Sequence, residues 1–544
     1  MATEKLITYD SELRTKLLNS VKKTADITKK TMGPKGLNVL LDDQRGARVT
    51  KDGITVIRSL QFKDPTENTA LKFIREASEK TNNIGDGTTG TCVLAEAIFS
   101  EGLKNLNFGV NGIHLRNGIQ KAANITIESV KKASKPVKTH DEIRQVAKIS
   151  SNHSDEIADV LADMFDKIGE NGTIRVEPGN SRVIESKVVE GMVFDSGYLS
   201  PYFITNEAMT FDVENPYVLI LGKKLSNISE ILSVLQSVTE TKMPLLIIAD
   251  GVEGDALATL VLNSLKGNLK SCAVNAPSYG TNKDNMLDDI AIITGGQVVS
   301  EKTGIAPNDA TVESHILGRA KRVIVTKDST TIIGGKGDES KVKERIEQLK
   351  TLLKAGGADA WDTAKMKERL AKLDGGVGII SVGANTQAEM LEKRDLVDDA
   401  FSACKAAIAG GVVPGGGVAL LRAADELQDY IDNHSEEFTD DEIIGAKILH
   451  DSLNAPIKTI LENAGESVDL IVAKLDEESD KQVGYDALNK KYGNMVELGV
   501  VDPTDVVVAE VENASSVASL LLTTAAACVL LPDEKQQSPT PGMM

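Results

Sequence analysis

The residues best suited to chemistry lie between positions 85 and 91, which read GDGTTGT. This segment combines three glycines, three threonines and the carboxylate of Asp86, and a helix-prone apolar run follows at 92–98. Amides at the start of a helix attract anions, and glycines let an anion approach the backbone. A carboxylate beside phosphates suits a magnesium ion that bridges both. The segment therefore indicates a site for a nucleotide with magnesium, although on its own a capped helix after a glycine turn is the simpler interpretation.

Three other segments could line the same site. Residues 33–36 (GPKG) offer a turn with exposed amides, Asp52 stands at the end of an expected strand, and residues 415–417 (GGG) open a helix. Each is weak alone, because glycine turns and Asp-Gly pairs are common in loops. The chain has no GxxxxGK(S/T) pattern, which excludes a P-loop ATPase. An aspartyl-phosphate phosphotransferase is disfavoured, because its loop follows an apolar strand and residues 79–83 are polar.

The middle of the chain carries a different signal. Residues 197–203 (GYLSPYF) gather three aromatic side chains in a chain with only 3% aromatic residues. Two amphipathic helices follow, with apolar residues at 228–235 and 257–262. Core packing is the better interpretation for Ile228, Ile231 and Leu260. For the others, an exposed apolar groove that binds proteins stays open, because exposed leucines forgo roughly 1.5–3 kcal/mol of burial each.

The periodicity of the chain indicates which elements position these residues. Apolar residues 13, 17, 21 and 25 predict a helix that ends near the glycine and proline of 32–36, and a second helix is expected at 68–80. Strands are expected at 39–41, 49–50, 173–176, 217–221, 245–249, 291–293, 323–325 and 375–382. A helical hairpin is expected at 341–373, broken at 356–357, and a loose tail at 533–544. The helical ends and the α/β middle predict one discontinuous domain with the middle inserted.

Composition narrows the class of protein further. A chain of 544 residues exceeds one core, and its net charge of −19 argues against a nucleic-acid or anionic-membrane partner. The four cysteines, at 92, 272, 404 and 528, form no CxxC pair, so neither a zinc site nor a disulfide framework is expected. The chain has no membrane-spanning apolar run and no signal-peptide core. We therefore expect a cytoplasmic protein of a bacterium or of a bacterial virus's host, or an organelle-matrix protein whose transit peptide was removed.

Taken together, the segments resemble the group I chaperonins, the GroEL-like family, in the same order from about residue 10 to 530. The resemblance rests on residues 32–36, 50–53, 85–89, 189–192, 197–203, 244–249, 415–417 and 502–504. It implies a mixed α and α/β fold, that of a three-domain chaperonin subunit. The helical equatorial domain would comprise 1–134 and 409–530, the small intermediate domain 135–190 and 376–408, and the α/β apical domain 191–375. A flexible tail would follow at 531–544.

The resemblance also implies roles for individual residues. By matching positions, Asp86 would coordinate Mg²⁺, Asp52 would position the attacking water, and Asp399 would be the main catalytic carboxylate. The other implied ATP contacts are Thr31, Met32, Gly33, Pro34, Lys51, Gly87, Thr88, Thr89, Gly90, Gly416, Tyr485, Asp486, Ala487, Val500 and Asp502, with K⁺ near Thr31 and Lys51. The implied apical positions for unfolded chains and a co-chaperonin are Tyr198, Tyr202, Phe203, Leu232, Leu235, Leu257, Val261 and Leu262.

Several positions depart from the family's pattern. Gly90 replaces the third threonine of Asp-Gly-Thr-Thr-Thr, which removes a hydroxyl on the phosphate side. Ser196 and Gln387 replace both members of an ion pair between subunits, while Phe108 and Ser467 alter the surface between rings. Exposed pairs contribute only about 0–1 kcal/mol each, but their loss around a ring shifts a conformational equilibrium. These departures predict altered allostery and make a single ring plausible.

The resemblance therefore implies an ATP hydrolase that captures non-native polypeptides and refolds them inside a homo-oligomeric, heptameric ring. Whether the ring is single or double, and whether a GroES-like co-chaperonin is needed, stays open. The alternative is a chaperonin-fold ring that acts as a scaffold or holdase with weak ATPase activity. Retention of Asp52, Asp86 and Asp399 argues against that alternative, because a scaffold has no use for three carboxylates around phosphate.

Overall fold

The computed structural model describes residues 5–43, 46–169, 172–179, 182–189, 191–206, 209–355, 360–374 and 376–531. The chain divides into two compact units. Unit 1 comprises Met1–Ala162, Pro178–Ile184 and Val382–Met544, and unit 2 comprises Asp163–Glu177 and Glu185–Ser381. The boundaries fall inside the two segments predicted as an intermediate domain, and the three-domain division stays a prediction.

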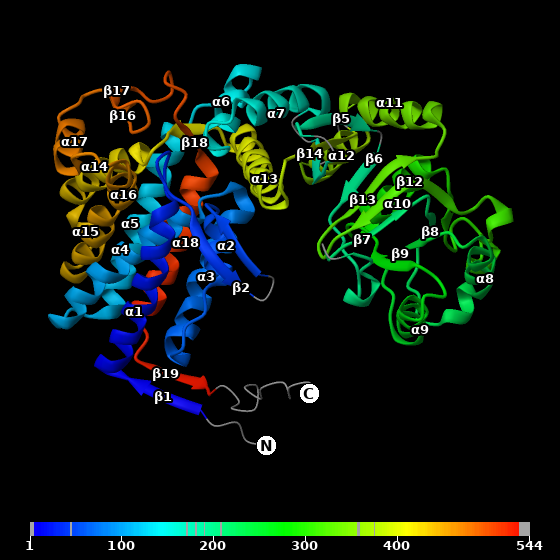
Figure 1. The fold of residues 1–544 in the computed structure, drawn as a ribbon, viewed down its shortest axis with the longest axis horizontal. Coiled ribbons are helices and arrows are strands. Elements are labelled where there is room, and N and C mark those ends of the chain that lie inside the picture. Colours follow the sequence, from blue (N-terminus) through cyan, green and yellow to red (C-terminus); the bar gives the residue numbers. More distant parts are fainter. Residues whose placement is uncertain are drawn as a thin grey trace. The chain divides into compact units, whose positions relative to one another are not determined.

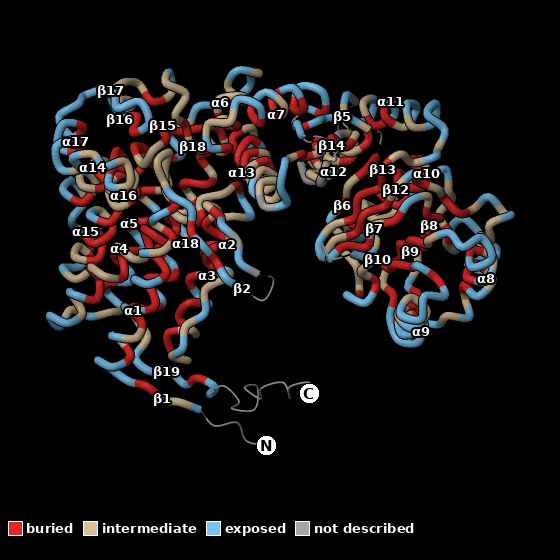
Figure 2. The backbone as a smooth tube through the Cα atoms, in the orientation of Figure 1, coloured by how far each residue is buried: buried red, intermediate tan, exposed pale blue. Residues whose placement is uncertain are grey.

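Unit 1 is built mainly from helices that the two ends of the chain share. Its helices are α1 (Asp10–Thr28), α2 (Gly53–Ser59), α3 (Pro65–Gly85), α4 (Thr88–Asn107), α5 (Gly112–Ala133), α6 (His140–Ser150), most of α7 (Asp155–Ile168), α13 (Gln387–Gly410), α14 (Val418–Asn433), α15 (Asp440–Ser452), α16 (Ala455–Ala464), α17 (Val468–Asp476) and α18 (Thr504–Leu522). Helix α18 packs against α3, α4 and α5, and α15 packs against α5. Their facing apolar side chains form one buried core (Figures 1 and 2).

The described residues of unit 1 also form four two-stranded antiparallel sheets. Strand β1 (Lys5–Tyr9) pairs with β19 (Ala526–Leu530), and β2 (Val39–Asp43) pairs with β3 (Gly46–Thr50). Strand β15 (Val412–Pro414) pairs with β18 (Val501–Pro503), and β16 (Val483–Asp486) pairs with β17 (Lys491–Asn494). The β1–β19 pairing joins the two chain ends directly.

Unit 2 is an α/β structure whose sheets are largely buried (Figure 2). Its larger sheet has the order β10 (Ser271–Asn275), β9 (Leu245–Ala249), β8 (Tyr217–Leu221), β12 (Gly318–Val325), β13 (Thr330–Gly335) and β6 (Gly191–Phe194). Strand β11 (Val298–Val299) joins β8, and β7 (Phe211–Glu214) joins β12. Strands β8, β9, β10 and β11 run parallel, while β12 is antiparallel to β7, β8 and β13.

The remaining elements of unit 2 are a small sheet and its helices. The small sheet has the order β4 (Thr173–Pro178), β14 (Val377–Val382), β5 (Glu185–Val189). The helices are α8 (Leu232–Thr241), α9 (Gly254–Leu265), α10 (Gly280–Thr294), α11 (Glu339–Ala355) and α12 (Ala360–Asp374), with short 3₁₀ turns η2 (Pro201–Phe203) and η3 (Ile228–Ile231). The mixed α and α/β fold class is thus confirmed, with the helices of unit 1 contributed by the chain ends.

Most expected elements are confirmed, and the differences have physical reasons. The expected strand at 291–293 is wrong, because these residues lie in α10. Positions 286, 287, 290, 291, 293 and 294 are all buried there, which is helical spacing rather than alternation. Helix α3 extends beyond 68–80, because Asp64 caps it through the amides of Thr66 and Glu67 and Pro65 suits its first position. The expected break at 356–357 and the tail at 533–544 lie outside the described residues.

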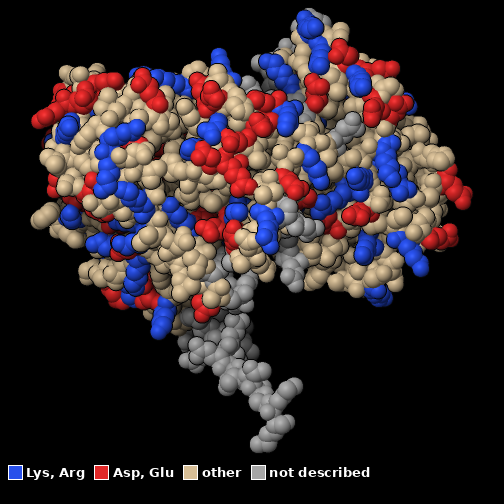
Figure 3. Space-filling model, turned by 45° about the horizontal axis from the view of Figure 1, so that its top comes forward, with Lys and Arg blue, Asp and Glu red and all other residues tan. Residues whose placement is uncertain are grey.

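Two further observations concern the surface charge and the apolar character of the helices. Acidic and basic side chains are interspersed on the face seen in Figure 3, despite the net charge of −19. Within the described ranges, no helix combines the length and the apolar character that crossing a bilayer requires.

Candidate functional site

Within the GDGTTGT segment, Asp86 and Gly87 form a tight turn between α3 and α4, and the threonines belong to the first turn of α4. Asp86 and Gly87 have φ angles of +73° and +94°, a region that suits glycine and strains an aspartate. A Cβ atom on residue 87 would lie 2.6 Å from Cγ1 of Val506, so only glycine fits there. The amide of Gly87 donates a 2.7 Å hydrogen bond to Oδ1 of Asp86. The turn therefore fixes the Asp86 carboxylate beside the N-terminus of α4, where the helix attracts anions.

Residues 31–53 form a second wall against α4. The Asp52 carboxylate caps α2 by accepting hydrogen bonds from the backbone amides of Ile54 (3.0 Å) and Thr55 (3.1 Å). A short helix therefore follows Asp52, where the sequence predicted only a turn. A Cβ atom on Gly53 would lie 2.5 Å from Oγ1 of Thr89, which shows how closely α2 approaches α4.

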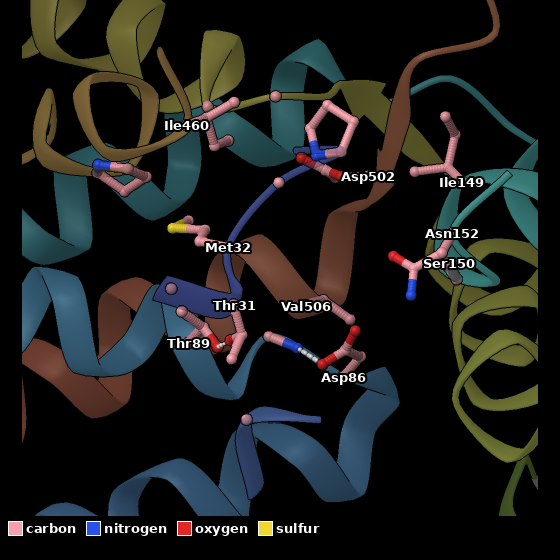
Figure 4. A pocket seen from close by; sticks show the side chains of 18 of the residues that line it. Thr31, Met32, Asp86, Thr89, Ile149, Ser150, Asn152, Ile460, Asp502 and Val506 are labelled. Atoms are coloured by element: carbon pink, nitrogen blue, oxygen red, sulfur yellow. Dashed lines mark hydrogen bonds between the residues drawn. The ribbon is translucent and has the colours of Figure 1, made fainter. Parts of the chain in front are cut away.

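The side chains of this wall also contact one another. The hydroxyls of Thr31 and Thr89 lie 3.4 Å apart (Figure 4). The Lys51 ammonium donates to the carbonyl oxygen of Gly33 (3.1 Å) and to Oδ1 of Asn152 (3.0 Å). Lys51 therefore ties the 33–36 turn to the end of α6.

The C-terminal half supplies the third wall. Gly416 and Gly417 have φ angles of +68° and +82°, and a Cβ atom on Gly417 would lie 2.7 Å from the amide nitrogen of Ile457. These two glycines are therefore required by the backbone. The pairing of β15 with β18 sets Asp502 opposite Val413, just before this turn. The β16–β17 hairpin contributes Tyr485, Asp486 and the following Ala487.

The three walls enclose one cavity of about 300 Å³. Its lining includes all but one of the predicted catalytic, metal and nucleotide residues: Thr31, Met32, Gly33, Pro34, Lys51, Asp52, Asp86, Gly87, Thr89, Gly90, Asp399, Gly416, Tyr485, Asp486, Ala487, Val500 and Asp502. Figure 4 shows Thr31, Thr89, Asp86 and Asp502 around the same space. The exception is Thr88, whose side chain is buried and donates to Oδ1 of Asn82 (3.0 Å). Its hydroxyl therefore does not face the cavity.

The cavity concentrates negative charge in a buried setting. Burial, with a smaller contribution from Asp52, raises the pKa of Asp86 to about 6. Burial, with Asp86 and Asp52 next, raises the pKa of Asp399 well above its usual value. Burial also lowers the pKa of Lys51. Carboxylates crowded in this way suit an anionic ligand only if a cation enters with it.

The donor set fits magnesium bound together with phosphates. Among the described residues, no group of three or more His, Cys, Asp or Glu side chains is arranged to hold a metal ion by itself. Mg²⁺ is commonly held by one or two carboxylates and completes its octahedral shell with phosphate oxygens and water. Asp86, at the helix N-terminus that would bind the phosphates, is the carboxylate best placed for this role.

The carboxyl of Asp502 predicts a pH-dependent stability. Burial, with a contribution from Asp86, raises its pKa to about 6, whereas an unfolded aspartate titrates near 4. Its stabilising contribution is therefore fully present below about pH 4 and is lost as the pH rises through about 6, a change of roughly 2–3 kcal/mol at most. We expect Asp502→Asn to weaken the fall in Tm between pH 4 and 7, measured by thermal unfolding without nucleotide. Parallel curves for variant and parent would contradict this prediction.

Sequence reasoning missed several residues that line the cavity: Ile149, Asn152, His153, Glu392, Asp395 and Glu510. Asn152 and His153 both have positive φ angles at the end of α6, and burial lowers the pKa of His153. They come from helix ends and helix faces that have no motif. Of these residues, only Glu510 is marked by a sequence feature, because it is the single charged residue within the apolar run 506–511.

The apolar residues predicted for polypeptide binding divide into exposed and buried sets. Tyr202, Leu232 and Leu262 are 62%, 47% and 51% exposed, while Tyr198, Leu257 and Val261 are partly buried against the core. Phe203 and Leu235 are buried, so the expectation that they lie on an exposed groove is wrong for this structure. Core packing is observed for Ile231 and Leu260, and Ile228 packs partly buried against the same core.

The exposed set shares one region of unit 2. Helix α9 contacts both η2 and η3, and α8 follows η3 directly. Leu265, at the end of α9, is 60% exposed and extends this region, although the sequence did not single it out. We call Tyr202, Leu232, Leu262 and Leu265 the η2–α8–α9 surface. Buried anchors such as Phe203 fix it to the sheet beneath.

Comparison with known proteins places this chain and its fold among the chaperonins. The TCP-1/cpn60 chaperonin family matches residues 24–529, and the chain belongs to this family. It is similar in structure to the chaperonin gp146 from the bacteriophage EL 2 (Pseudomonas aeruginosa), in two crystal forms. One has a TM-score of 0.74 at 21% identity and covers 97% of this chain and 100% of gp146. The match to the other crystal form has a TM-score of 0.66 at 20% identity and covers 97% of this chain and 99% of gp146.

Proposed function

We propose that this protein is an ATP-dependent chaperonin that binds and hydrolyses Mg-ATP in the cavity of unit 1. The observation that carries the proposal is the convergence of three glycine turns with Asp52, Asp86 and Asp399 around one space. The gp146 structures, obtained in the presence of ATP-BeFx, support an adenine nucleotide as the ligand. Client polypeptides would bind the η2–α8–α9 surface of unit 2.

The chemistry follows from the positions of the side chains. Amides at the start of α4 and in the 33–36 turn would bind the phosphates, with Asp86 as the Mg²⁺ ligand. Asp52 and Asp399 would orient and deprotonate the attacking water. Burial and the neighbouring carboxylates raise the pKa of Asp399 and so favour its neutral form, and cations that offset those carboxylates would favour its ionised form. Gly416 and Asp502 would contact the ribose, and Tyr485, Ala487 and Val500 the adenine, with K⁺ near Thr31 and Lys51.

Unpaired strand edges support assembly into a ring. The β2–β3 and β1–β19 sheets each have only two strands, so each strand leaves one edge unpaired among the described residues. Leu37, Leu40 and Val49 in or beside the first sheet are 72%, 73% and 54% exposed. Exposed edges with apolar side chains are normally covered by another chain. We therefore propose a homo-oligomeric ring, heptameric by family resemblance, in which neighbouring subunits cover these edges.

One experiment separates a folding machine from a scaffold. A chemically denatured test enzyme is diluted into the purified protein with Mg-ATP, with a non-hydrolysable analogue, or without nucleotide, and regained activity and phosphate release are measured. A chaperonin should restore activity only with hydrolysable ATP, with or without an added GroES-like co-chaperonin. Capture of the enzyme without phosphate release or recovery would instead indicate a scaffold or holdase and overturn the proposal.

A further inference from the structure

The space beside Gly90 is filled by a side chain from a distant part of the chain. Glu510, on α18, extends to the first turn of α4, and a Cβ atom on residue 90 would collide with its carboxyl group. A Cβ atom on Gly87 would lie 3.0 Å from the same Oε1 atom. Glu510 also lines the nucleotide cavity. The hydroxyl that the family pattern places at residue 90 is therefore not simply missing, because a carboxyl group occupies the space where that side chain would begin.

Two side chains of α18 together support the turn. Val506 and Glu510 are four residues apart and so lie on one face of the helix. Val506 contacts the position of Gly87, and Glu510 contacts those of Gly87 and Gly90. Residue 87 must be glycine, because its φ is +94° and a Cβ atom there would meet Val506, whereas a side chain at residue 90 would require the carboxyl group of Glu510 to move. The packing thus joins the floor of the cavity to the segment that would bind the phosphates.

The same contacts determine where Asp86 lies. The Gly87 amide donates to Oδ1 of Asp86 at 2.7 Å, and the Gly87 carbonyl accepts the amide of Thr91 at 3.0 Å. A displacement of Gly87 would therefore move the Asp86 carboxylate together with the first turn of α4. Such a displacement would weaken the contacts that position the phosphates of a bound nucleotide.

We propose that Glu510 is a positioning residue for the phosphate-binding turn, and that its carboxyl group replaces the side chain that Gly90 lacks. This inference rests on the proposed ATPase function of the same site. Glu510 acts through Gly87 and Gly90 on Asp86 and the α4 amides, and it takes no proton in the reaction. Gly90 and Glu510 form a matched pair, because the absence of a side chain at residue 90 leaves the space that the Glu510 carboxyl group fills.

Shape rather than charge carries this role. Burial, followed by the nearby Asp502 and Asp86, raises the pKa of Glu510 well above its usual value, which favours the neutral carboxyl. No lysine or arginine among the described residues forms an ion pair with it. A neutral carboxyl and a carboxamide have nearly the same shape. Glutamine should therefore replace Glu510, whereas alanine should not.

The test is a reciprocal exchange in the full-length protein. Mg-ATP hydrolysis is measured for the parent, Glu510→Gln, Glu510→Ala, Gly90→Thr and the double variant Gly90→Thr/Glu510→Ala, with Tm recorded for each. We expect Glu510→Ala and Gly90→Thr each to raise KM for Mg-ATP about 10-fold with kcat changed less, because ground-state positioning of the phosphates is lost. The double variant and Glu510→Gln should stay within about 3-fold of the parent.

Each other outcome is informative. If the two single effects multiply in the double variant, the residues act independently and the pairing is wrong. If Glu510→Gln is as impaired as Glu510→Ala, charge rather than shape matters and the inference is overturned. If one single variant has a markedly lower Tm, the activities of the double variant and of Glu510→Gln test the inference instead. Absence of turnover in the parent would refute the proposed function, whereas parental turnover without rescue would refute only this inference.

Discussion

Asp399→Ala is expected to reduce ATP turnover about 100-fold or more while leaving nucleotide binding largely intact. Asp399 lines the cavity from α13, and Asp86 and Asp52 are the charges that act on it most strongly. Once a magnesium–phosphate complex offsets those charges, Asp399 would be the carboxylate free to accept a proton from water. In the proposed site other residues would contact the phosphates and the adenine, so nucleotide affinity should change little. Steady-state phosphate release and calorimetric titration with a non-hydrolysable analogue measure the two effects separately.

The neighbouring aspartate provides a matched control. Asp398 is the same residue type on the same helix but is exposed and does not line the cavity. Asp398→Ala should keep turnover within about 2-fold of the parent, because an exposed charge has only a small electrostatic effect. Turnover by Asp399→Ala close to the parental rate would exclude the assigned role. Very low turnover in the parent as well would favour the scaffold alternative.

The cavity was largely predictable because its residues carry local chemical signals. Gly87, Gly416 and Gly417 adopt backbone conformations that favour glycine, Asp86 lies beside the first of these, and Asp52 caps helix α2. A sequence reveals these features one segment at a time. Their convergence depends on the packing of α18 against α3 and α4, which no segment shows alone, and family resemblance supplied that step.

Residues whose role depends on tertiary packing were harder to predict. Ala291 reads equally well in a strand or a buried helix, because an apolar triplet is too short to show its period. Phe203 and Leu235 carry the apolar character expected of a binding surface, yet they are buried as anchors beneath it. Thr88 belongs to the phosphate motif, but its hydroxyl turns to Asn82. Glu510 was missed because the contact that defines it spans more than four hundred residues of sequence.

The η2–α8–α9 surface leads to the second large expected effect. Leu232→Glu/Leu262→Glu should weaken capture of a denatured test protein at least about 10-fold, because each leucine buried on binding contributes roughly 1.5–3 kcal/mol and a charge opposes apolar contact. Both side chains are about half exposed, so the fold should tolerate the change, and ATP turnover should persist because unit 1 is untouched. Leu352→Glu is the matched control, since Leu352 is 56% exposed on α11 of the same unit. Capture is measured as suppression of light scattering when the denatured protein is diluted. Equal suppression by the double variant and the control would mean that clients bind elsewhere, because the charged pair would then have met no apolar partner.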